Sequence, residues 1–118
     1  MSRQDKPFMK ADAAKLIFDI REAITDIQKF TNEMTFDEYV SDDKTRAAVE
    51  RKFEVVGEAC TRLRDRAPDV FATLPDAPKI IGFRNRLIHG YDQVDDAIVW
   101  DVISQKMPEL LKSLPKSS

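Results

Sequence analysis

Residues 43–66 read DKTRAAVERKFEVVGEACTRLRDR, a stretch with a regular alternation of apolar and polar side chains. Its apolar side chains return every three or four residues, at Val49, Phe53, Val56, Cys60 and Leu63. That spacing places them on one face of a helix, because an α-helix completes a turn in about 3.6 residues. Most of the other positions are polar or charged. The segment is therefore predicted to be a long amphipathic helix with one buried face.

A second apolar stripe of the same kind lies near the N-terminus. Its members are again three or four residues apart: Leu16, Ile20, Ala23, Ile27 and Phe30. The stripe predicts a first helix at about residues 9–32. Between the two long helices, Thr35 and Glu38 have the spacing of a capping box, which predicts a short helix through Phe36 and Tyr39.

Aspartate, proline and glycine predict where the other helices begin and end. Asp42 or Asp43 can cap the long helix, and Pro68 ends it, because proline disfavours helical geometry in the residue before it. Residues 69–74 can form one further turn.

The C-terminal third predicts two more helices. The first runs through IIGFRNRLIH, from an N-cap at Asp76 to a left-handed terminator at Gly90. The second is capped by Asp95 or Asp96, and Pro108 should kink or interrupt it before LLKSL.

The whole pattern predicts an all-α protein, an antiparallel bundle of four to five helices with short connections. Gly57 and Gly82 lie inside predicted helices, where glycine costs about 1 kcal/mol relative to alanine. Another helix should therefore approach closely at each of them. We expect a single domain over residues 1–118, with a helical core at about 9–114 and a disordered tail at 115–118.

Composition excludes several classes of protein. No apolar stretch approaches the roughly 20 residues that cross a bilayer, and the N-terminal residues lack the apolar segment of a signal peptide. The single cysteine, Cys60, cannot form a disulfide within the chain. These features favour a cytoplasmic protein without a membrane partner.

The charge distribution is more informative than the net charge of −2. Residues 44–66 carry seven basic and four acidic side chains, whereas the segments near both ends are acidic. A local phosphate site is compatible with this pattern, but general coating of DNA is not. The plainer interpretation of the basic segment is a solvated helix face.

Metal and cysteine chemistry find no support in the sequence. One histidine and one cysteine, far apart, match no structural zinc spacing, and no glycine-rich phosphate loop is present. Cys60 lies on an apolar stripe, which favours a core position over a nucleophile. We therefore predict no metal and no cofactor.

Polar residues crowd together at the end of the IIGFRNRLIH helix. They are Arg84, Asn85, Arg86, His89 and Tyr91. Asn85 and Arg86 lie four and three residues before His89, so all three can share a face, whereas Arg84 is turned about 140° away from His89. A purely structural interpretation exists, because an imidazolium near a helix C-terminus interacts favourably with the helix dipole.

The order arginine, four residues, histidine, one residue, tyrosine resembles the motif of the HepT-like toxins, a branch of the HEPN superfamily. Arg84, His89 and Tyr91 match that motif, and Asn85 is the polar residue usual after its arginine. The stretch VERKFEVVGEACTRL resembles the family's central helix, with four residues where its pattern expects them: Arg51, Glu54, Gly57 and Glu58.

Two more stretches extend the resemblance over nearly the whole chain. TFDEYVSDDKTRAAV resembles the segment before the central helix, and IIGFRNRLIHGYDQVDDAIVWDVI resembles the motif helix and its successor. The resemblance covers about residues 10–114. No departure of this sequence from the family's pattern removes a motif residue.

This resemblance implies a HEPN-type bundle that works as a homodimer and as a metal-independent endoribonuclease toxin, with tRNA one candidate substrate. It implies a partner as well, a cognate minimal nucleotidyltransferase that serves as antitoxin. In this family the partner silences the toxin by attaching AMP to the motif tyrosine, here Tyr91.

The residue types suit this chemistry independently of the resemblance. RNA carries its own nucleophile, the 2′-hydroxyl, so cleavage needs a base near neutral pH and a cation for the phosphate. His89 suits proton transfer, and the Arg84 guanidinium can donate two parallel hydrogen bonds to a phosphate. Asn85 and Arg86 would support them, Asn85 by orienting the imidazole or a phosphate oxygen. Because the chain has one histidine, an acid and base pair of histidines needs two chains, which a C2 dimer would supply.

Two residues of the central helix have a double interpretation. Arg51 and Glu58 suit a salt bridge or a solvated face, but Glu58 could instead contact Arg84 and hold it in place. Arg62 and its basic neighbours are ordinary exposed arginines unless they extend an RNA path. Trp100 is expected in the core or in a dimer interface.

Two other functions compete with the ribonuclease toxin. One is a non-catalytic HEPN protein that binds nucleotide or RNA, or that serves mainly as partner of a nucleotidyltransferase. The intact pair of Arg84 and His89 favours the enzyme over it. The other is a structural helical adaptor, which explains the bundle but not the polar cluster.

Overall fold

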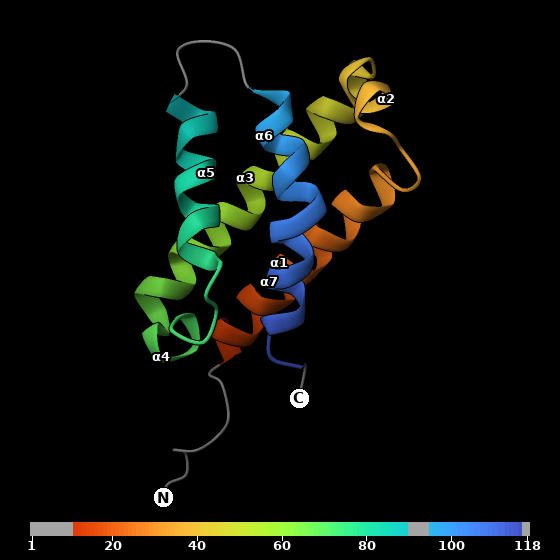
Figure 1. Ribbon diagram of the computed structural model, residues 1–118. Coiled ribbons are helices and arrows are strands. Elements are labelled where there is room, and N and C mark those ends of the chain that lie inside the picture. The colour runs from red at the N-terminus through yellow and green to blue at the C-terminus, as the bar shows by residue number, and fades with distance from the viewer. Residues whose placement is uncertain (1–10, 90–94, 117–118) are drawn as a thin grey trace, which may run out of the picture.

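A computed structural model describes residues 11–89 and 95–116, and every element within these ranges is a helix (Figure 1). The elements are α1 (Ala11–Phe30), α2 (Phe36–Val40), α3 (Asp43–Arg66), α4 (Pro68–Phe71), α5 (Ala77–His89), α6 (Asp96–Asp101), η1 (Val102–Lys106) and α7 (Met107–Ser113). The predicted all-α bundle is confirmed, since α1, α3, α5 and the run from α6 to α7 are its main helices and α2 and α4 are short.

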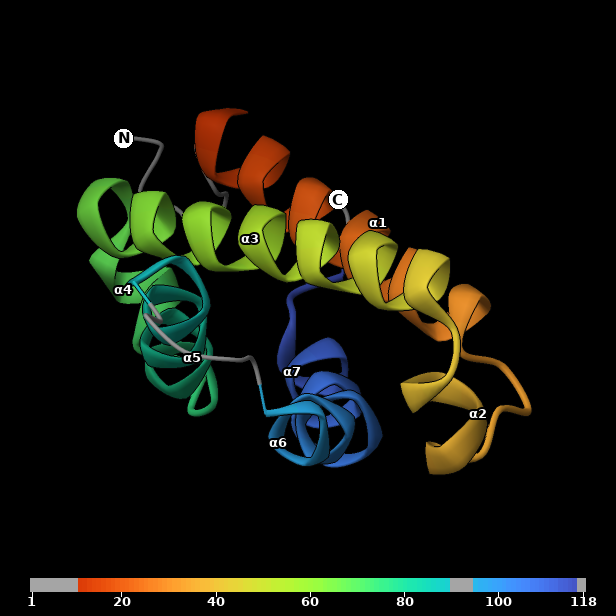
Figure 2. The ribbon, with the colours of Figure 1, turned by 90° about the horizontal axis from the view of Figure 1, so that it is seen from above.

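Helices α1 and α3 run antiparallel, side by side, and form one layer of the molecule (Figure 2). The apolar stripe predicted on α3 is buried along its whole length, and most of the stripe on α1 is buried too. Phe30 is the exception. It is the last residue of α1 and is 40% exposed.

The second layer consists of α5 and of the continuous run α6–η1–α7, which lie beside one another on the same side of the α1–α3 pair (Figure 2). Helix α5 packs on α3, where Phe53 and Phe83 make an edge-to-face contact with ring centroids 5.1 Å apart. At the other end of the layer, Trp100 of α6 packs on Tyr39 of α2 with centroids 5.2 Å apart. Trp100 is half-buried and therefore belongs to the edge of the core.

Local capping fixes the helix boundaries close to where the sequence places them. Thr35 and Glu38 form the predicted capping box around the start of α2. Asp42 is the N-cap of α3 and accepts a hydrogen bond from the Thr45 amide. Helix α3 ends at Arg66, two residues before the proline that was expected to stop it, and Asp95 caps α6. Gly90, the expected terminator of α5, lies outside the described residues.

Pro108 distorts the last helix without interrupting it. A proline in an α-helix lacks the N–H of its own hydrogen bond, and its ring clashes with the carbonyl four residues earlier. The chain widens into the π-helical turn η1 just before it, where the Met107 amide donates to the Val102 carbonyl. The helix then continues through α7, so the predicted interruption is wrong and the predicted distortion is confirmed.

The chain remains attached to the bundle slightly beyond the predicted core. Leu114 is buried, and the Pro115 carbonyl accepts a hydrogen bond of 2.5 Å from the Arg21 guanidinium of α1. Within the described ranges, no helix combines the length and the apolar character that a bilayer crossing requires.

Candidate active site on helix α5

Helix α5 carries the polar cluster and is anchored on α3 by its apolar side. Ala77, Ile80 and Ile81 are buried, and Phe83 and Leu87 are partly buried against the core. The remaining side of the helix is open to solvent, with Lys79, Gly82, Asn85 and Arg86 all exposed. Arg84 is half-buried, and the root of its side chain faces Gly57 of α3.

Gly57 of α3 is the residue that allows Arg84 to pack where it does. A Cβ atom at position 57 would come within 3.0 Å of the Arg84 Cδ and closer still to its Cβ and Cγ. Two of these atoms lie at the root of the side chain, so a rotamer change could not relieve the clash and α5 itself would have to move. The expected close approach at Gly57 is confirmed, and its partner is the arginine of the motif.

Gly82 shows the opposite situation. A Cβ atom built at position 82 would have no heavy atom within 4 Å, and the glycine is exposed. The expected close approach of another helix at Gly82 is therefore wrong for this chain. The helical pattern identified a glycine in an unfavourable place, but it could not indicate that nothing in the fold faces it.

The Arg84 guanidinium has no acidic partner among the described residues. Its Nη1 donates to the Asn85 side-chain oxygen at 3.3 Å, and its buried Nε meets no acceptor there. A carboxylate nearby would compete with any anionic ligand for the guanidinium. Without one, the positive charge is available to a phosphate, and guanidinium suits that ligand because it can donate two parallel hydrogen bonds.

The structure describes the side chains of only two of the other members of the cluster. Asn85 and Arg86 are exposed on α5, and Asn85 contacts Arg84 directly, so the two residues form one polar unit. His89 is the last residue of the helix, but its side chain is outside the described set. Tyr91 also lies outside the described residues.

Glu58 does not contact Arg84 as one of the interpretations expected. Its carboxylate pairs with Arg62 on the same helix at 2.9 Å, and both side chains are about half exposed. Glu58 and Arg62 line a pocket of about 250 Å³ on the seam between α1 and α3, together with Leu16 and Asp19. The adjacent residue, Gly57, makes the close contact with Arg84 instead.

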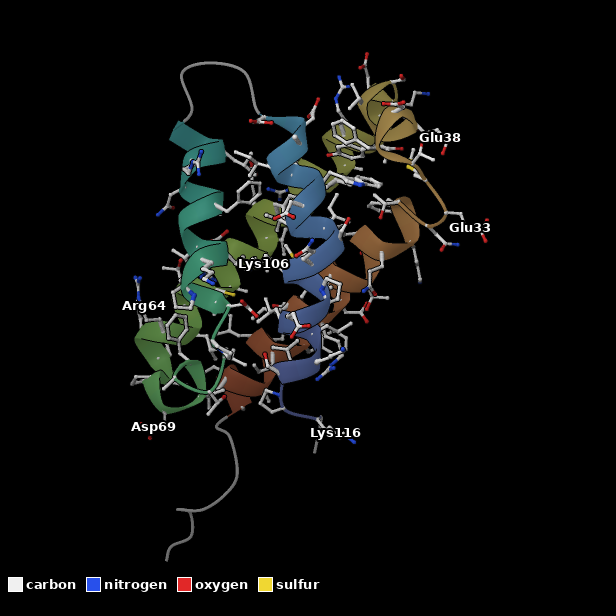
Figure 3. All side chains as sticks on the ribbon, in the orientation of Figure 1. Glu33, Glu38, Arg64, Asp69, Lys106 and Lys116 are labelled. Carbon is white, nitrogen blue, oxygen red and sulfur yellow. The ribbon has the colours of Figure 1, made fainter. Side chains whose placement is uncertain are left out.

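The other arginines of α3 are also neutralised. Arg51 pairs with Glu54, Arg64 with Asp65, and Arg66 with Asp12 of α1. Figure 3 shows Arg64 projecting outward near the end of α3. The plainer interpretation of this basic segment, a solvated face of ion pairs, is confirmed.

The described residues provide neither a reactive cysteine nor a cluster of metal ligands. Cys60 is fully buried, and burial raises the pKa of its thiol to about 12, so almost none of it is thiolate at neutral pH. Its predicted core position is confirmed. In the part of the chain that the structure describes, no three histidine, cysteine or acidic residues gather closely enough to hold a metal ion.

One polar cluster was missed by the sequence analysis. At the junction of α2, α3 and α6, Arg46 donates to the Val40 carbonyl, pairs with Asp43 at 2.5 Å and lies 4.0 Å from Asp96. Burial raises the pKa of the enclosed Tyr39 hydroxyl, and Glu50 and Asp96 raise it further. The cluster ties the start of α6 to the main layer. No local signal marks it, because its members come from separate segments.

Fold and site together define a class: the chain is a helical bundle of the HEPN type, with the motif arginine of that class on its third long helix. The family model "Ribonuclease HepT-like" matches residues 20–116. The chain is 38% identical over 107 residues to the candidate RNase MJ0127 of Methanocaldococcus jannaschii, covering 89% of this chain and 86% of that one. It is 35% identical over 105 residues to "Probable ribonuclease HepT" of Thermococcus cleftensis, covering 86% and 92%.

The chain therefore belongs to the HepT-like ribonuclease family. No solved structure matches it at a significant level.

Proposed function

We propose that this protein is a metal-independent endoribonuclease, the toxin of a two-component module, and that Arg84 and His89 carry out its reaction. The observation that carries the proposal is the state of Arg84. Its side chain is fixed against Gly57, and no acidic group among the described residues neutralises it. It stands on the helix that ends at His89, the single histidine of the chain.

The reaction uses the 2′-hydroxyl of RNA as the nucleophile. His89 accepts the proton of that hydroxyl while its oxygen forms a bond to the adjacent phosphorus. The bond from phosphorus to the 5′-oxygen breaks, and this oxygen receives a proton from an imidazolium. The products are a 2′,3′-cyclic phosphate and a 5′-hydroxyl. Arg84 donates hydrogen bonds to the phosphate oxygens, whose negative charge increases in the transition state.

A homodimer follows from the count of histidines. One imidazole removes a proton while another supplies one, and each chain holds a single histidine. A C2 dimer that brings two α5 helices together provides both. The same arrangement places two Arg84 side chains near one phosphate path.

The test replaces the two residues separately. Arg84→Ala and His89→Ala should each abolish cleavage of RNA and toxicity in cells, while circular dichroism shows an intact helical bundle. Arg51→Ala is the matched control, because Arg51 is 73% exposed and paired with Glu54. This variant should cleave like the wild type.

Two further measurements address the mechanism. Wild-type protein should cleave RNA in EDTA, and the upstream product should end in a cyclic phosphate or its hydrolysis product. A strict requirement for magnesium, or a 3′-hydroxyl end, would contradict the mechanism. Binding of RNA without cleavage by the wild type would favour the non-catalytic alternative.

Regulation by a partner is the second component of the proposal. A cognate minimal nucleotidyltransferase would transfer AMP from ATP to the Tyr91 hydroxyl and release pyrophosphate. Tyr91 is two residues from His89 in sequence, so the added phosphate would oppose an RNA phosphate by repulsion and could occupy Arg84. Tyr91→Phe should leave cleavage largely intact and make the toxin resistant to its partner. An unmodified Tyr91 peptide from a fully neutralised complex would contradict this mode of control.

A further inference from the structure

The end of the bundle formed by α2 and α6 is strongly acidic. Residues 31–43, which contain α2, carry five acidic and no basic side chains, and residues 95–101, which contain α6, carry three acidic and no basic ones. The two helices lie side by side, with Trp100 of α6 packed on Tyr39 of α2. The acidic side chains of both segments therefore gather at one end of the molecule, where Figure 3 shows Glu38 projecting outward.

The described fold compensates little of this negative charge. Arg46 of α3 pairs with Asp43 and lies 4.0 Å from Asp96. The other six acidic residues of the two segments form no salt bridge with a described residue: Glu33, Asp37, Glu38, Asp42, Asp95 and Asp101. In contrast, four acidic residues of α1 and α3 each pair with a lysine or an arginine: Asp19, Asp26, Glu54 and Glu58.

Aromatic side chains are exposed at the same end of the molecule. Phe30 and Phe36, on either side of the turn between α1 and α2, are 40% and 38% exposed. The Phe36 ring centroid lies 6.2 Å from that of Trp100, which is half-buried. Among the described residues only one other large apolar side chain, Phe18 of α1, is exposed to this degree. We call these three aromatic residues of the α2 end and the six unpaired acidic ones the acidic aromatic surface.

The charge of this surface restricts what can cover it. RNA is a polyanion and would be repelled, and a second copy related by a two-fold axis would bring the same acidic residues together. A protein segment with basic side chains suits the carboxylates. A basic side chain also suits the face of Trp100, and an apolar one suits the exposed phenylalanines, since aromatic residues are enriched in contacts between proteins.

Helix α6 connects this surface to Tyr91. The Asp95 side chain accepts hydrogen bonds from the Ala97 and Ile98 amides and so fixes the start of the helix. Tyr91 precedes Asp95 by four residues, so even a fully extended chain keeps their Cα atoms within about 14 Å of each other. A protein bound on α6 is therefore within reach of the tyrosine.

We infer that the acidic aromatic surface is the docking surface of the nucleotidyltransferase that modifies Tyr91, which binds it through a segment of basic and apolar side chains. The inference rests on the proposed control of Tyr91 and extends it, since it assigns recognition of the partner to residues outside the motif. Helices α2 and α5 lie on opposite sides of the molecule (Figures 1 and 2), so the partner and the phosphate at Arg84 are held by separate residues.

The first test measures binding of the purified nucleotidyltransferase to the variant Asp37→Lys/Asp101→Lys. Both residues are exposed, and neither caps its helix. The association rate should fall about tenfold at low ionic strength, and added salt should shrink the difference from the wild type because it screens the charges. In AMP transfer with ATP and magnesium, the KM for this variant should rise while kcat stays unchanged, because docking precedes the chemical step.

The matched control is Asp69→Lys/Glu109→Lys, which changes the net charge by the same amount. Asp69 of α4 and Glu109 of α7 are both exposed, and Figure 3 shows Asp69 at the end of the molecule opposite Glu38. This variant should bind the partner like the wild type. An equal loss in both variants would overturn the inference, because it would show attraction by overall charge. Unchanged binding by Asp37→Lys/Asp101→Lys would overturn it as well.

The second test compares two exposed phenylalanines of α1. Phe30→Gln removes an aromatic ring of the surface and should weaken binding of the partner several-fold, whereas Phe18→Gln, 56% exposed and outside the surface, should leave binding unchanged. Circular dichroism should show an intact bundle in both variants. Equal effects of the two substitutions would overturn the inference. So would a lower mass of free Phe30→Gln than of free wild type by light scattering, because a second copy would then cover this surface.

These outcomes separate the docking surface from the function on which it rests. If Tyr91 is modified equally well in the wild type and in Asp37→Lys/Asp101→Lys, the docking surface fails and the proposed control remains. If the partner binds through this surface and the wild type does not cleave RNA, the ribonuclease proposal fails and the docking surface remains. If the wild type cleaves RNA and does not bind the nucleotidyltransferase, the docking surface and the control of Tyr91 both fail.

Discussion

Helices α3 and α5 are both rich in arginine and lysine, but they differ in whether these side chains form salt bridges. On α3 six of the seven cations pair with carboxylates of the same helix or of α1, and the apolar stripe opposite them makes the core. On α5 none of the cations forms a salt bridge with a described residue, and the helix lies at the edge of its layer (Figures 1 and 2). The number of basic residues would favour α3 as a candidate site for an anion. The absence of salt bridges among the described residues favours α5 instead.

The two glycines of these helices repeat the contrast. Gly57 on α3 is required by a neighbour inside the molecule, because Arg84 occupies the space of its missing side chain. Gly82 on α5 has no such neighbour. Sequence alone treats the two positions alike, since each is a glycine within a helical pattern. The structure distinguishes them, because only Gly57 has a neighbour that occupies the space of its missing side chain.

The largest loss of stability and of RNA cleavage is expected for Gly57→Ala. The new Cβ would overlap the root of Arg84, so α5 must shift away from α3, and such overpacking lowers the free energy of unfolding by about 1–3 kcal/mol. RNA cleavage should fall by far more than stability alone explains, because Arg84 moves with the helix. Chemical denaturation and single-turnover cleavage measure the two effects.

A double-variant cycle identifies the cause of that effect. Arg84→Gly removes the atoms that the new methyl group would meet, so the cost of Gly57→Ala should shrink in its presence. Equal costs of Gly57→Ala with and without the Arg84 side chain would show that the two residues do not interact in this way.

Most of the helices could be predicted from the sequence because their signals are local. The capping box at Thr35, the N-cap at Asp42 and the stop before Pro68 depend on neighbours within a few residues, and all three are confirmed. The apolar stripes predicted which faces are buried. Phe30, at the last position of α1, is the exception, because a periodic pattern does not indicate which turns of a helix its neighbours cover.

The candidate site was predictable as a set of residues, but not as a set of contacts. The motif placed Arg84 and Asn85 together correctly, since they are neighbours in sequence. It left Glu58 with two interpretations, and the structure shows the salt bridge, to Arg62 one turn further along α3, rather than a contact with Arg84. The partners of a long side chain depend on distances between helices, which spacing within one helix does not contain.

An intermediate effect, on the pH dependence of stability, is expected for substitution of Glu50. Unlike the other acidic residues of α3, Glu50 forms no salt bridge with a described residue. Burial raises the pKa of this half-buried carboxyl, and the nearby Asp96 raises it further, against a smaller opposing effect of Arg46. Because the folded pKa lies above the unfolded one, the stabilising contribution is present below the unfolded pKa and is lost as pH rises through the folded pKa.

Unfolding at a series of pH values measures this contribution. Glu50→Gln should gain stability relative to the wild type as pH rises from about 4, the ordinary glutamate range, toward 7. Asp96→Asn is the control, because it removes the like charge and should bring the pKa of Glu50 closer to its ordinary value. A difference between Glu50→Gln and the wild type that is constant across pH would contradict the raised pKa.

The smallest loss of stability and of RNA cleavage is expected for Glu58→Gln. A small loss would support the contrast between α3, whose charges are paired, and α5, whose charges are not. Glu58 and Arg62 form an exposed pair within one helix, and such pairs contribute about 0.3–0.5 kcal/mol. If α3 serves packing and α5 serves binding, loss of this pair should leave cleavage within about twofold of the wild type, the effect of a change near 0.5 kcal/mol. Arg62→Gln should behave likewise.

A tenfold fall in cleavage by Glu58→Gln, with Arg62→Gln unaffected, would mean that Glu58 acts on the reaction and not on its neighbour. In that case Glu58 would contact Arg84 or RNA in the working assembly, and the separation of roles between α3 and α5 would not hold.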